Sequence, residues 1–215
     1  FGVMALIKYV PEVDVTIAIF IALFIVCFFL KVMTYHGSLA SSLIGAAFFK
    51  IAGWQIFIFI MSCYVLLIGI HFLRKVLKVK NKDIVKKQKG KDLMQVAANG
   101  LIALIFLIIF AITKNNKLLV MSLLVFTNSF VDSIASDIGS MSKKKPYDIF
   151  KHKFVDQGQS GGISVLGTVS SFIASCIFAV CIWLLTNCNP LMMIVFVISM
   201  NICCFVDTMF GSLFQ

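Results

Sequence analysis

Two aspartates within one short stretch, residues 128–141, carry the clearest chemical signal in the sequence, because they directly follow a long apolar run. A carboxylate in the hydrocarbon core of a membrane costs about 2.5–3.5 kcal/mol, so Asp132 and Asp137 need a cation, a proton or a charged partner. Asp132 and Ser136 are four residues apart and share one face of a helix, whereas Asp137 is rotated by about 140° from Asp132. Both aspartates can face one cavity only if the helix ends or distorts nearby, for which Gly139 is a suitable residue.

A third carboxylate, Asp207, lies in the apolar stretch NICCFVDTMFGSLFQ and has no basic residue beside it in sequence. Three carboxylates brought together repel one another and raise the pKa of at least one of them, unless a cation lies among them. Magnesium prefers oxygen ligands and commonly takes one or two carboxylates together with substrate phosphates. We therefore predict a Mg²⁺ site formed by Asp132, Asp137 and Asp207, with a bound proton as the alternative.

The loop DQGQSGGIS, residues 156–164, is a candidate phosphate site. Two glycines before a helix let the backbone approach a ligand and leave N–H groups free at the positive helix end. The loop does not match GxxxxGK[ST], which excludes a Walker-type site, and a simple turn before a helix is the alternative reading. Acids on the same membrane face favour the phosphate site. Its expected residues are Gly158, Gly161, Gly162 and Ser164, with Lys153 supplying positive charge.

The composition indicates an integral membrane protein. Hydrophobic residues make up 60% and charged residues 13% of the chain, whereas a soluble domain carries about 25% charged residues. Several runs reach the roughly 20 apolar residues needed to cross a bilayer, and they must be helical because lipid offers the backbone no hydrogen-bond partners. We predict an all-α, polytopic transmembrane helical bundle that forms a single integral membrane domain over residues 1–215.

Seven spans are expected, with six as the alternative because the second is short and rich in small residues. They lie near residues 14–31, 37–52, 54–73, 94–113, 117–136, 162–186 and 190–212. The net charge of +10 is concentrated in two basic loops, 74–92 and 140–160. Such loops are the ordinary positive-inside signal, so both loops are expected to be cytoplasmic and near anionic headgroups, and no nucleic-acid partner is expected.

The seven cysteines form no CxxC pairs and have no histidines close by in sequence, so neither a disulfide framework nor a zinc site is expected. The chain begins without Met and stops inside a motif, so we expect it to be part of a longer protein.

With this topology, polar residues of four separate segments converge on the cytoplasmic face. Gln95 and Asn99 open the fourth span, and Asp132 to Asp137 close the fifth. Gly158, Gly161, Gly162 and Ser164 lie at the start of the sixth, and Asp207, Gly211 and Gln215 close the seventh.

Four sequence blocks carry a resemblance to a known family: DLMQVAANG (92–100), VDSIASDIGSMSKKKP (131–146), DQGQSGGISVLGT (156–168) and CFVDTMFGSLFQ (204–215). In this order they resemble the family that contains the plant and cyanobacterial phytyl-phosphate kinases and transmembrane protein 19. The family also resembles dolichol kinase and phosphatidate cytidylyltransferase, which use CTP and lipid phosphates at the membrane surface. The sequence departs from the family pattern in three places. Asp137 stands where the family usually has Glu, residues 156–159 replace Pro-Pro-Gly-Thr, and Phe150-Lys151 stands in an expected Thr-rich stretch.

The resemblance implies a Mg²⁺-dependent kinase that converts an isoprenoid monophosphate, of the phytyl or geranylgeranyl phosphate type, to the diphosphate with CTP or another nucleoside triphosphate. Asp132, Asp207 and Asn99 are then the expected catalytic residues, and Asp132, Asp137 and Asp207 the metal ligands. The expected nucleotide-binding residues are Gln95, Ser136, Lys153, Gly158, Gly161, Gly162, Ser164 and Gln215. A CTP-dependent cytidylyltransferase making a CDP-lipid and a cation- or proton-coupled transporter are the alternatives.

Overall fold

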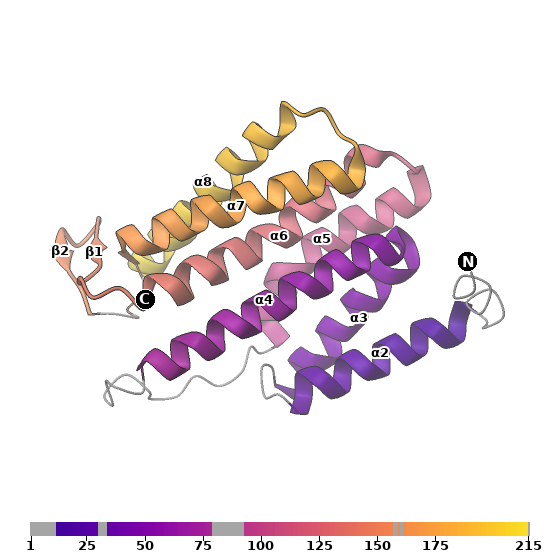
Figure 1. Ribbon diagram of the computed structural model, residues 1–215, viewed down its shortest axis with the longest axis horizontal. Coiled ribbons are helices and arrows are strands. Elements are labelled where there is room, and N and C mark those ends of the chain that lie inside the picture. The colour runs from indigo at the N-terminus through magenta and orange to yellow at the C-terminus, as the bar shows by residue number, and fades with distance from the viewer. Residues whose placement is uncertain (1–11, 30–33, 79–92, 157–158, 160, 215) are drawn as a thin grey trace. The chain divides into compact units, whose positions relative to one another are not determined.

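The computed structural model describes residues 12–29, 34–78, 93–156, 159 and 161–214 (Figure 1). The described residues form seven long helices, and the prediction of an all-α membrane fold is confirmed. The helices are α2 (Glu12–Phe29), α3 (Tyr35–Ala52), α4 (Trp54–Lys78), α5 (Leu93–Thr113), α6 (Asn116–Gly139), α7 (Val165–Thr186) and α8 (Met192–Phe214).

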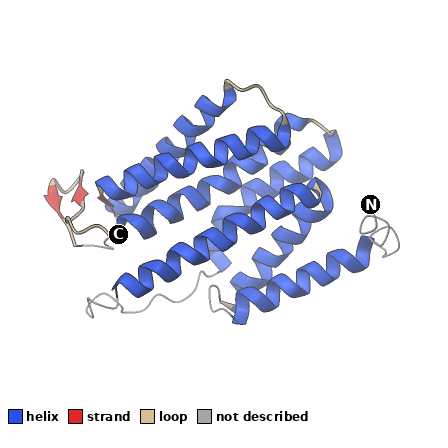
Figure 2. Cartoon of the chain, viewed as in Figure 1, coloured by secondary structure: helices blue, strands red, loops and turns tan. Residues whose placement is uncertain are grey.

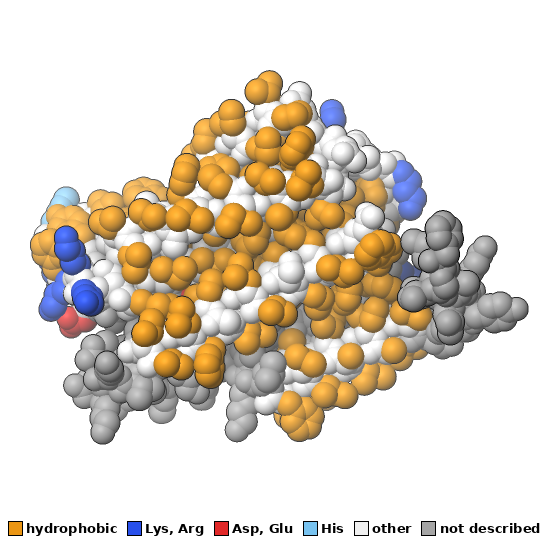
Figure 3. Space-filling view, in the orientation of Figure 1, with side chains coloured by type: hydrophobic (Ala, Val, Ile, Leu, Met, Phe, Trp, Pro, Cys, Tyr) orange, Lys and Arg blue, Asp and Glu red, His pale blue; other side chains and the backbone are white. Residues whose placement is uncertain are grey.

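Five of these helices, α4 to α8, are long and apolar enough to cross a membrane, and Val15–Phe29 is a shorter apolar helix. Hydrophobic side chains are spread over the visible faces of the helices, as expected for surfaces in contact with lipid (Figure 3). α4 continues to Lys78, so the first part of the expected basic loop at 74–92 is helical. Residues 79–92 lie outside the described residues.

The chain divides into two compact units, which we describe separately. The first contains residues 1–60 and 89–119, with α2, α3 and α5. Its α3 is a closely packed helix that buries small residues such as Ser38, Ser42 and Gly45. A Cβ on Gly45 would lie 2.8 Å from Leu23 Cδ1 of α2, so the missing side chain lets these two helices approach.

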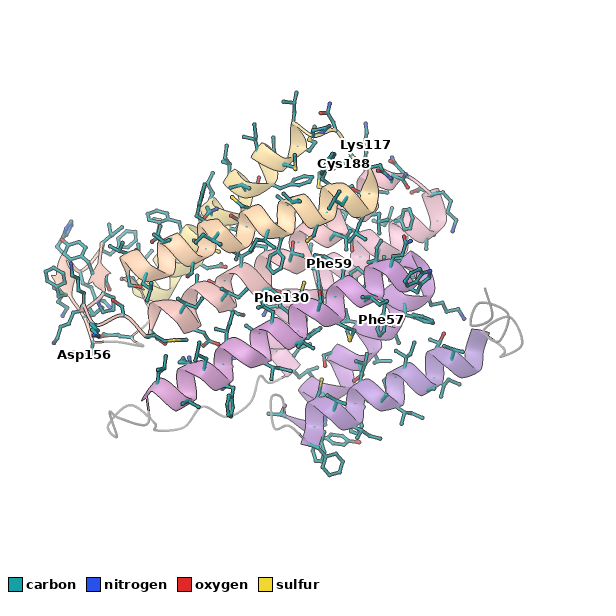
Figure 4. The ribbon with its side chains drawn as sticks, in the orientation of Figure 1. Phe57, Phe59, Lys117, Phe130, Asp156 and Cys188 are labelled. Carbon is teal, nitrogen blue, oxygen red and sulfur yellow. The ribbon has the colours of Figure 1, made fainter. Side chains whose placement is uncertain are left out.

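The second unit contains residues 61–88 and 120–215 and brings together the later part of α4 with α6, α7 and α8. Tyr64 of α4 packs edge-on against Phe130 of α6, with ring centroids 4.9 Å apart. Phe130 lies along the middle of α6 in Figure 4. Asn201 of α8 donates to Ser175 Oγ of α7 at 2.8 Å and accepts from Ser171 Oγ at 2.9 Å. These contacts join α4 to α6 and α7 to α8.

α6 and α7 meet at a pair of glycines. A Cβ on Gly139 would lie 3.1 Å from Gly167 Cα, and a Cβ on Gly167 would lie 3.0 Å from the carbonyl oxygen of Ala135. Ser164 is the N-cap of α7 and accepts a hydrogen bond from Gly167 N, while its hydroxyl donates to Gly139 O at 3.3 Å. Side chains at either glycine would separate the end of α6 from the start of α7.

The connection between α6 and α7 forms a small antiparallel sheet that the sequence pattern does not predict (Figure 2). Its strands are β1 (Tyr147–Asp148), β2 (Lys153–Phe154) and β3 (Gly162–Ile163), in the order β2-β1-β3. Because Gly162 and Ile163 pair with β1, α7 begins at Val165 rather than at the expected residue 162.

Candidate functional site

A cavity of about 490 Å³ lies within the second unit, between α6, α7, α8 and the segment that leads into α7. Asp132 and Ser136 of α6 line it on one side, and Asp207 and Thr208 of α8 line it on another. The remaining wall is rich in small and polar residues. It includes Gly139, Ser140, Gln159, Gly161, Gly162, Ser164, Gly167, Thr168, Ser171, Asn201 and Gly211.

Two of the three expected acids share this cavity. Asp132 is half-buried and Asp207 is exposed, and the Cys204 thiol is close enough to both carboxylates to interact with their charges. Among the described residues, no group of three or more His, Cys, Asp or Glu side chains is placed to hold a metal ion. The expected set of three carboxylates is therefore a pair in the structure.

Asp137 is directed to a different neighbour. Its carboxylate accepts a hydrogen bond from Arg74 Nη1 of α4 and lies 3.5 Å from His71 Nδ1. The side chain is only 12% exposed, and Asp137 does not line the cavity. The 140° rotation from Asp132 along the helix explains this, because α6 stays helical through Gly139 and places the two aspartates on different faces. The guanidinium of Arg74 compensates the buried charge of Asp137.

The glycines of the expected phosphate loop pack tightly against protein. Gly161 has φ +87°, in the left-handed region, and a Cβ there would lie 2.6 Å from Ser212 Cα of α8. A Cβ on Gly162 would lie 2.9 Å from both Pro146 Cβ and Val155 Cγ2. The close fit against α8 and the sheet is enough to require glycine at both positions. Both residues nevertheless line the cavity, as does Ser164.

A buried carboxylate that sequence reasoning did not single out anchors this loop. Asp148 of β1 is 0% exposed and accepts hydrogen bonds from the backbone N–H groups of Phe150 and Lys151, both at 3.0 Å. Ser212 of α8 donates to both of its oxygens. The N–H of Lys151, with further help from Ser212, holds the pKa of the Asp148 carboxyl below its ordinary value although burial opposes this.

The chain belongs to the DUF92 family. The family described as "Integral membrane protein DUF92" matches residues 18–215. This family membership makes the chain an integral, multi-pass membrane protein. The chain is also similar to "Uncharacterized membrane protein MJ0933" of Methanocaldococcus jannaschii, with 26% identity over 172 residues that cover 77% of this chain and 71% of that protein. No solved structure matches the chain.

Other expected site residues of this DUF92 chain fall outside the cavity wall. Lys153 is exposed on β2 and does not line the cavity. Gln95 and Asn99 belong to α5 of the first unit, whose placement relative to the cavity is not described. Gly158 and Gln215 lie outside the described residues. Their expected roles stay predictions.

The cavity combines three features that suit a phosphate-bearing ligand with a divalent cation. Asp132 and Asp207 supply carboxylate oxygens, and Ser136 and Thr208 supply hydroxyl oxygens, which is the hard donor set that Mg²⁺ prefers. The first turn of α7 forms part of the wall at Ser164 and Thr168, where the positive end of the helix dipole favours negative charge.

Proposed function

We propose that this DUF92 protein is a Mg²⁺-dependent lipid-phosphate kinase. It phosphorylates an isoprenoid monophosphate to the diphosphate and uses CTP or another nucleoside triphosphate as the phosphate donor. One observation carries the proposal: a single cavity at the end of three membrane helices holds two carboxylates together with the first turn of α7. The resemblance to phytyl-phosphate kinases agrees with this arrangement. The lysines of the α6–α7 connection support a cytoplasmic placement of the cavity by the positive-inside rule, and nucleotides are present on that side.

In the proposed reaction, an oxygen of the lipid monophosphate attacks the γ-phosphorus of the nucleotide. The bond from that phosphorus to the bridging oxygen breaks, and the nucleoside diphosphate leaves with the electron pair. Phosphoryl transfer depends chiefly on positioning and on neutralising charge, so no protein nucleophile is needed. Bound Mg²⁺ would supply positive charge against the phosphate oxygens.

The residues of the cavity have separate parts in this proposal. Asp132 and Asp207 would hold the metal ion from two different helices. The backbone around Gly161 and the first turn of α7 would face the phosphates, and Ser136 would donate a hydrogen bond to them. Asp137 is assigned no ligand role, because Arg74 already engages its carboxylate.

Purified protein in detergent provides the test. It would be given Mg²⁺, geranylgeranyl phosphate and labelled CTP or ATP, and the lipid products would be resolved by mass. A prenyl diphosphate with release of nucleoside diphosphate is expected. A CDP-lipid with pyrophosphate would instead favour the cytidylyltransferase, and no product from folded protein would favour transport.

Substitutions distinguish a metal-binding pair from incidental carboxylates. Asp132→Asn and Asp207→Asn should each lower turnover by at least about a hundredfold, since each removes a charged ligand that neutralises phosphate. Asp156→Asn is the matched control, because Asp156 is an exposed acid outside the cavity that pairs with Lys145. Near-normal turnover in both cavity variants would contradict the metal assignment.

A further inference from the structure

Residues 143–154, which we call the basic hairpin, expose lysines and large apolar side chains together. The segment contains β1, β2 and the turn between them. Figure 3 shows Lys side chains gathered beside hydrophobic ones at the end of the protein that carries these strands. An exposed mixture of this kind is unusual for a loop that faces only water, because large exposed apolar patches usually mark an interaction site.

The basic hairpin lies between two helices that can each cross a membrane. It connects α6 to α7, and both helices are long and apolar enough to cross a bilayer. In Figure 4, Asp156 lies at the hairpin end of α7, and Cys188 lies at the opposite end of the same helix. Because only residues 140–142 separate the end of α6 from the hairpin, a membrane crossed by α6 would have its headgroups close to the hairpin.

The charges of the basic hairpin are mostly uncompensated. Lys145 forms a 3.0 Å ion pair with Asp156, and Lys151 lies 3.8 Å from the buried Asp148. The other three lysines, Lys143, Lys144 and Lys153, are exposed and form no ion pair within the described part of the chain. Three positive charges therefore point to an anionic partner outside the protein.

The apolar side chains of the hairpin are of the type found at membrane surfaces. Phe154 is 69% exposed, and Tyr147, Ile149 and Phe150 are each about 40% exposed. Tyr147 and Phe154 pack edge-on across the two strands, with ring centroids 5.3 Å apart. Aromatic residues favour the interface between headgroups and acyl chains.

The basic hairpin is also held in one conformation, which lowers the entropic cost of binding. Asp148 closes the turn by accepting from the N–H groups of Phe150 and Lys151, and Ser212 ties the same carboxylate to α8. Val155 N donates to Pro146 O at 2.9 Å and continues the pairing of the two strands. A preformed surface does not need to be ordered when the partner binds.

We propose that the basic hairpin docks on anionic phospholipid headgroups of the membrane that the protein itself spans. Lys143, Lys144 and Lys153 contact the phosphates, and Phe154 inserts at the acyl boundary. A lipid surface fits both features, since it offers negative charge and an apolar layer at the level where the hairpin lies. This docking is independent of the kinase proposal, because it requires no occupied cavity.

Native mass spectrometry of the full chain in detergent, titrated with phosphatidylglycerol or phosphatidylcholine, tests the charge contribution. The triple variant Lys143→Gln, Lys144→Gln and Lys153→Gln should bind phosphatidylglycerol about fivefold more weakly for each lysine removed, since one lysine near an anionic surface contributes about 1 kcal/mol. Phosphatidylcholine binding should not change. The control variant Lys114→Gln with Lys117→Gln removes one charge directly after α5 and one in the first turn of α6, and it should bind phosphatidylglycerol like the wild type.

A second measurement tests the apolar contact. Phe154→Trp, made with Trp54→Phe and Trp183→Phe so that one tryptophan remains, would be reconstituted into vesicles with brominated acyl chains. Fluorescence quenching greater in phosphatidylglycerol than in phosphatidylcholine is expected. Unchanged phosphatidylglycerol affinity in the triple variant, equal loss in the control variant, or an unquenched tryptophan would overturn the proposal.

Discussion

Ser212 of α8 donates its hydroxyl to both carboxylate oxygens of Asp148 in β1, at 2.7 and 2.8 Å. This contact links the small sheet to the last helix, and Gly161 lies directly against the same residue of α8. Since Gly161 and Gly162 form part of the cavity wall, the contact sets the position of that wall relative to Asp207. Asp148 and Ser212 are thus positioning residues that do not line the cavity themselves.

Removing the Ser212 hydroxyl should weaken this attachment. Ser212→Ala leaves the buried carboxylate of Asp148 without one of its hydrogen-bond donors. It should therefore lower the Tm of the detergent-solubilised protein by several degrees, since each kcal/mol of lost unfolding free energy lowers the Tm by roughly 2–4 °C. Ser199→Ala is the control, because Ser199 is only half-buried on the same helix and its hydroxyl donates to Val195 O of that helix. Equal Tm values for the two variants would contradict the anchoring role.

Acid should release the same anchor. The folded-state pKa of Asp148 lies below its ordinary value, so its ionisation stabilises the fold at all pH values above the unfolded pKa of about 3.9. That contribution is lost as pH falls through the folded pKa. We expect the Tm of Asp148→Asn to be lower than wild type at pH 6, and the difference to shrink progressively below about pH 4. A difference that stayed constant across this range would show that the charge of Asp148 is not stabilising.

Hydropathy predicted most of the helices, but it predicted neither the small sheet nor the ion-pair partner of Asp137. The boundaries of α3, α5 and α8 lie within two residues of the predicted spans, since a bilayer requires long apolar helices. The sheet was missed because strands of two residues leave no periodic pattern. The partner of Asp137 was missed because Arg74, distant in sequence, is brought to it by helix packing.

The candidate cavity was predicted in part, for a physical reason. Topology alone predicts that Asp132, Asp207 and the loop at 156–164 lie at the same membrane face. Both aspartates line one cavity together with Gln159 and residues 161–164. Topology does not fix the rotation of each helix, which is why Asp137 was expected beside Asp132. The anchoring role of Asp148 was not predicted, because a single aspartate in a polar loop usually lies exposed to solvent.

The glycine contact between α6 and α7 should be sensitive to one methyl group. Gly167→Ala would bring a Cβ within 3.0 Å of a backbone oxygen that cannot move independently, so it should cost about 1–3 kcal/mol. Gly69→Ala in α4 is the control, because a Cβ there meets no described atom within 4 Å and alanine favours helix. Thermal unfolding should show a loss for Gly167→Ala only, and the same loss at Gly69 would point to a general effect of glycine replacement.

Asp132 and Asp137 lie five residues apart on one helix, but replacing each by Asn should have a different effect. One replacement should weaken ligand binding, and the other should lower stability. Asp132→Asn should lower the affinity for Mg²⁺ and CTP by at least about tenfold with little change in Tm, because its side chain lines the cavity and is half-buried.

Asp137→Asn should leave that affinity within about twofold and instead destabilise the protein by about 3 kcal/mol, because it removes the carboxylate that pairs with the Arg74 guanidinium, which is only 13% exposed. Adding Arg74→Gln to Asp137→Asn should recover part of the lost stability, since the double variant no longer buries the guanidinium charge in the absence of its carboxylate. Isothermal titration with Mg²⁺ and CTP, alongside thermal unfolding, separates the two effects. A loss of Mg²⁺-dependent nucleotide affinity in Asp137→Asn at unchanged Tm would return Asp137 to the metal site and imply that Arg74 releases it when the ligand binds.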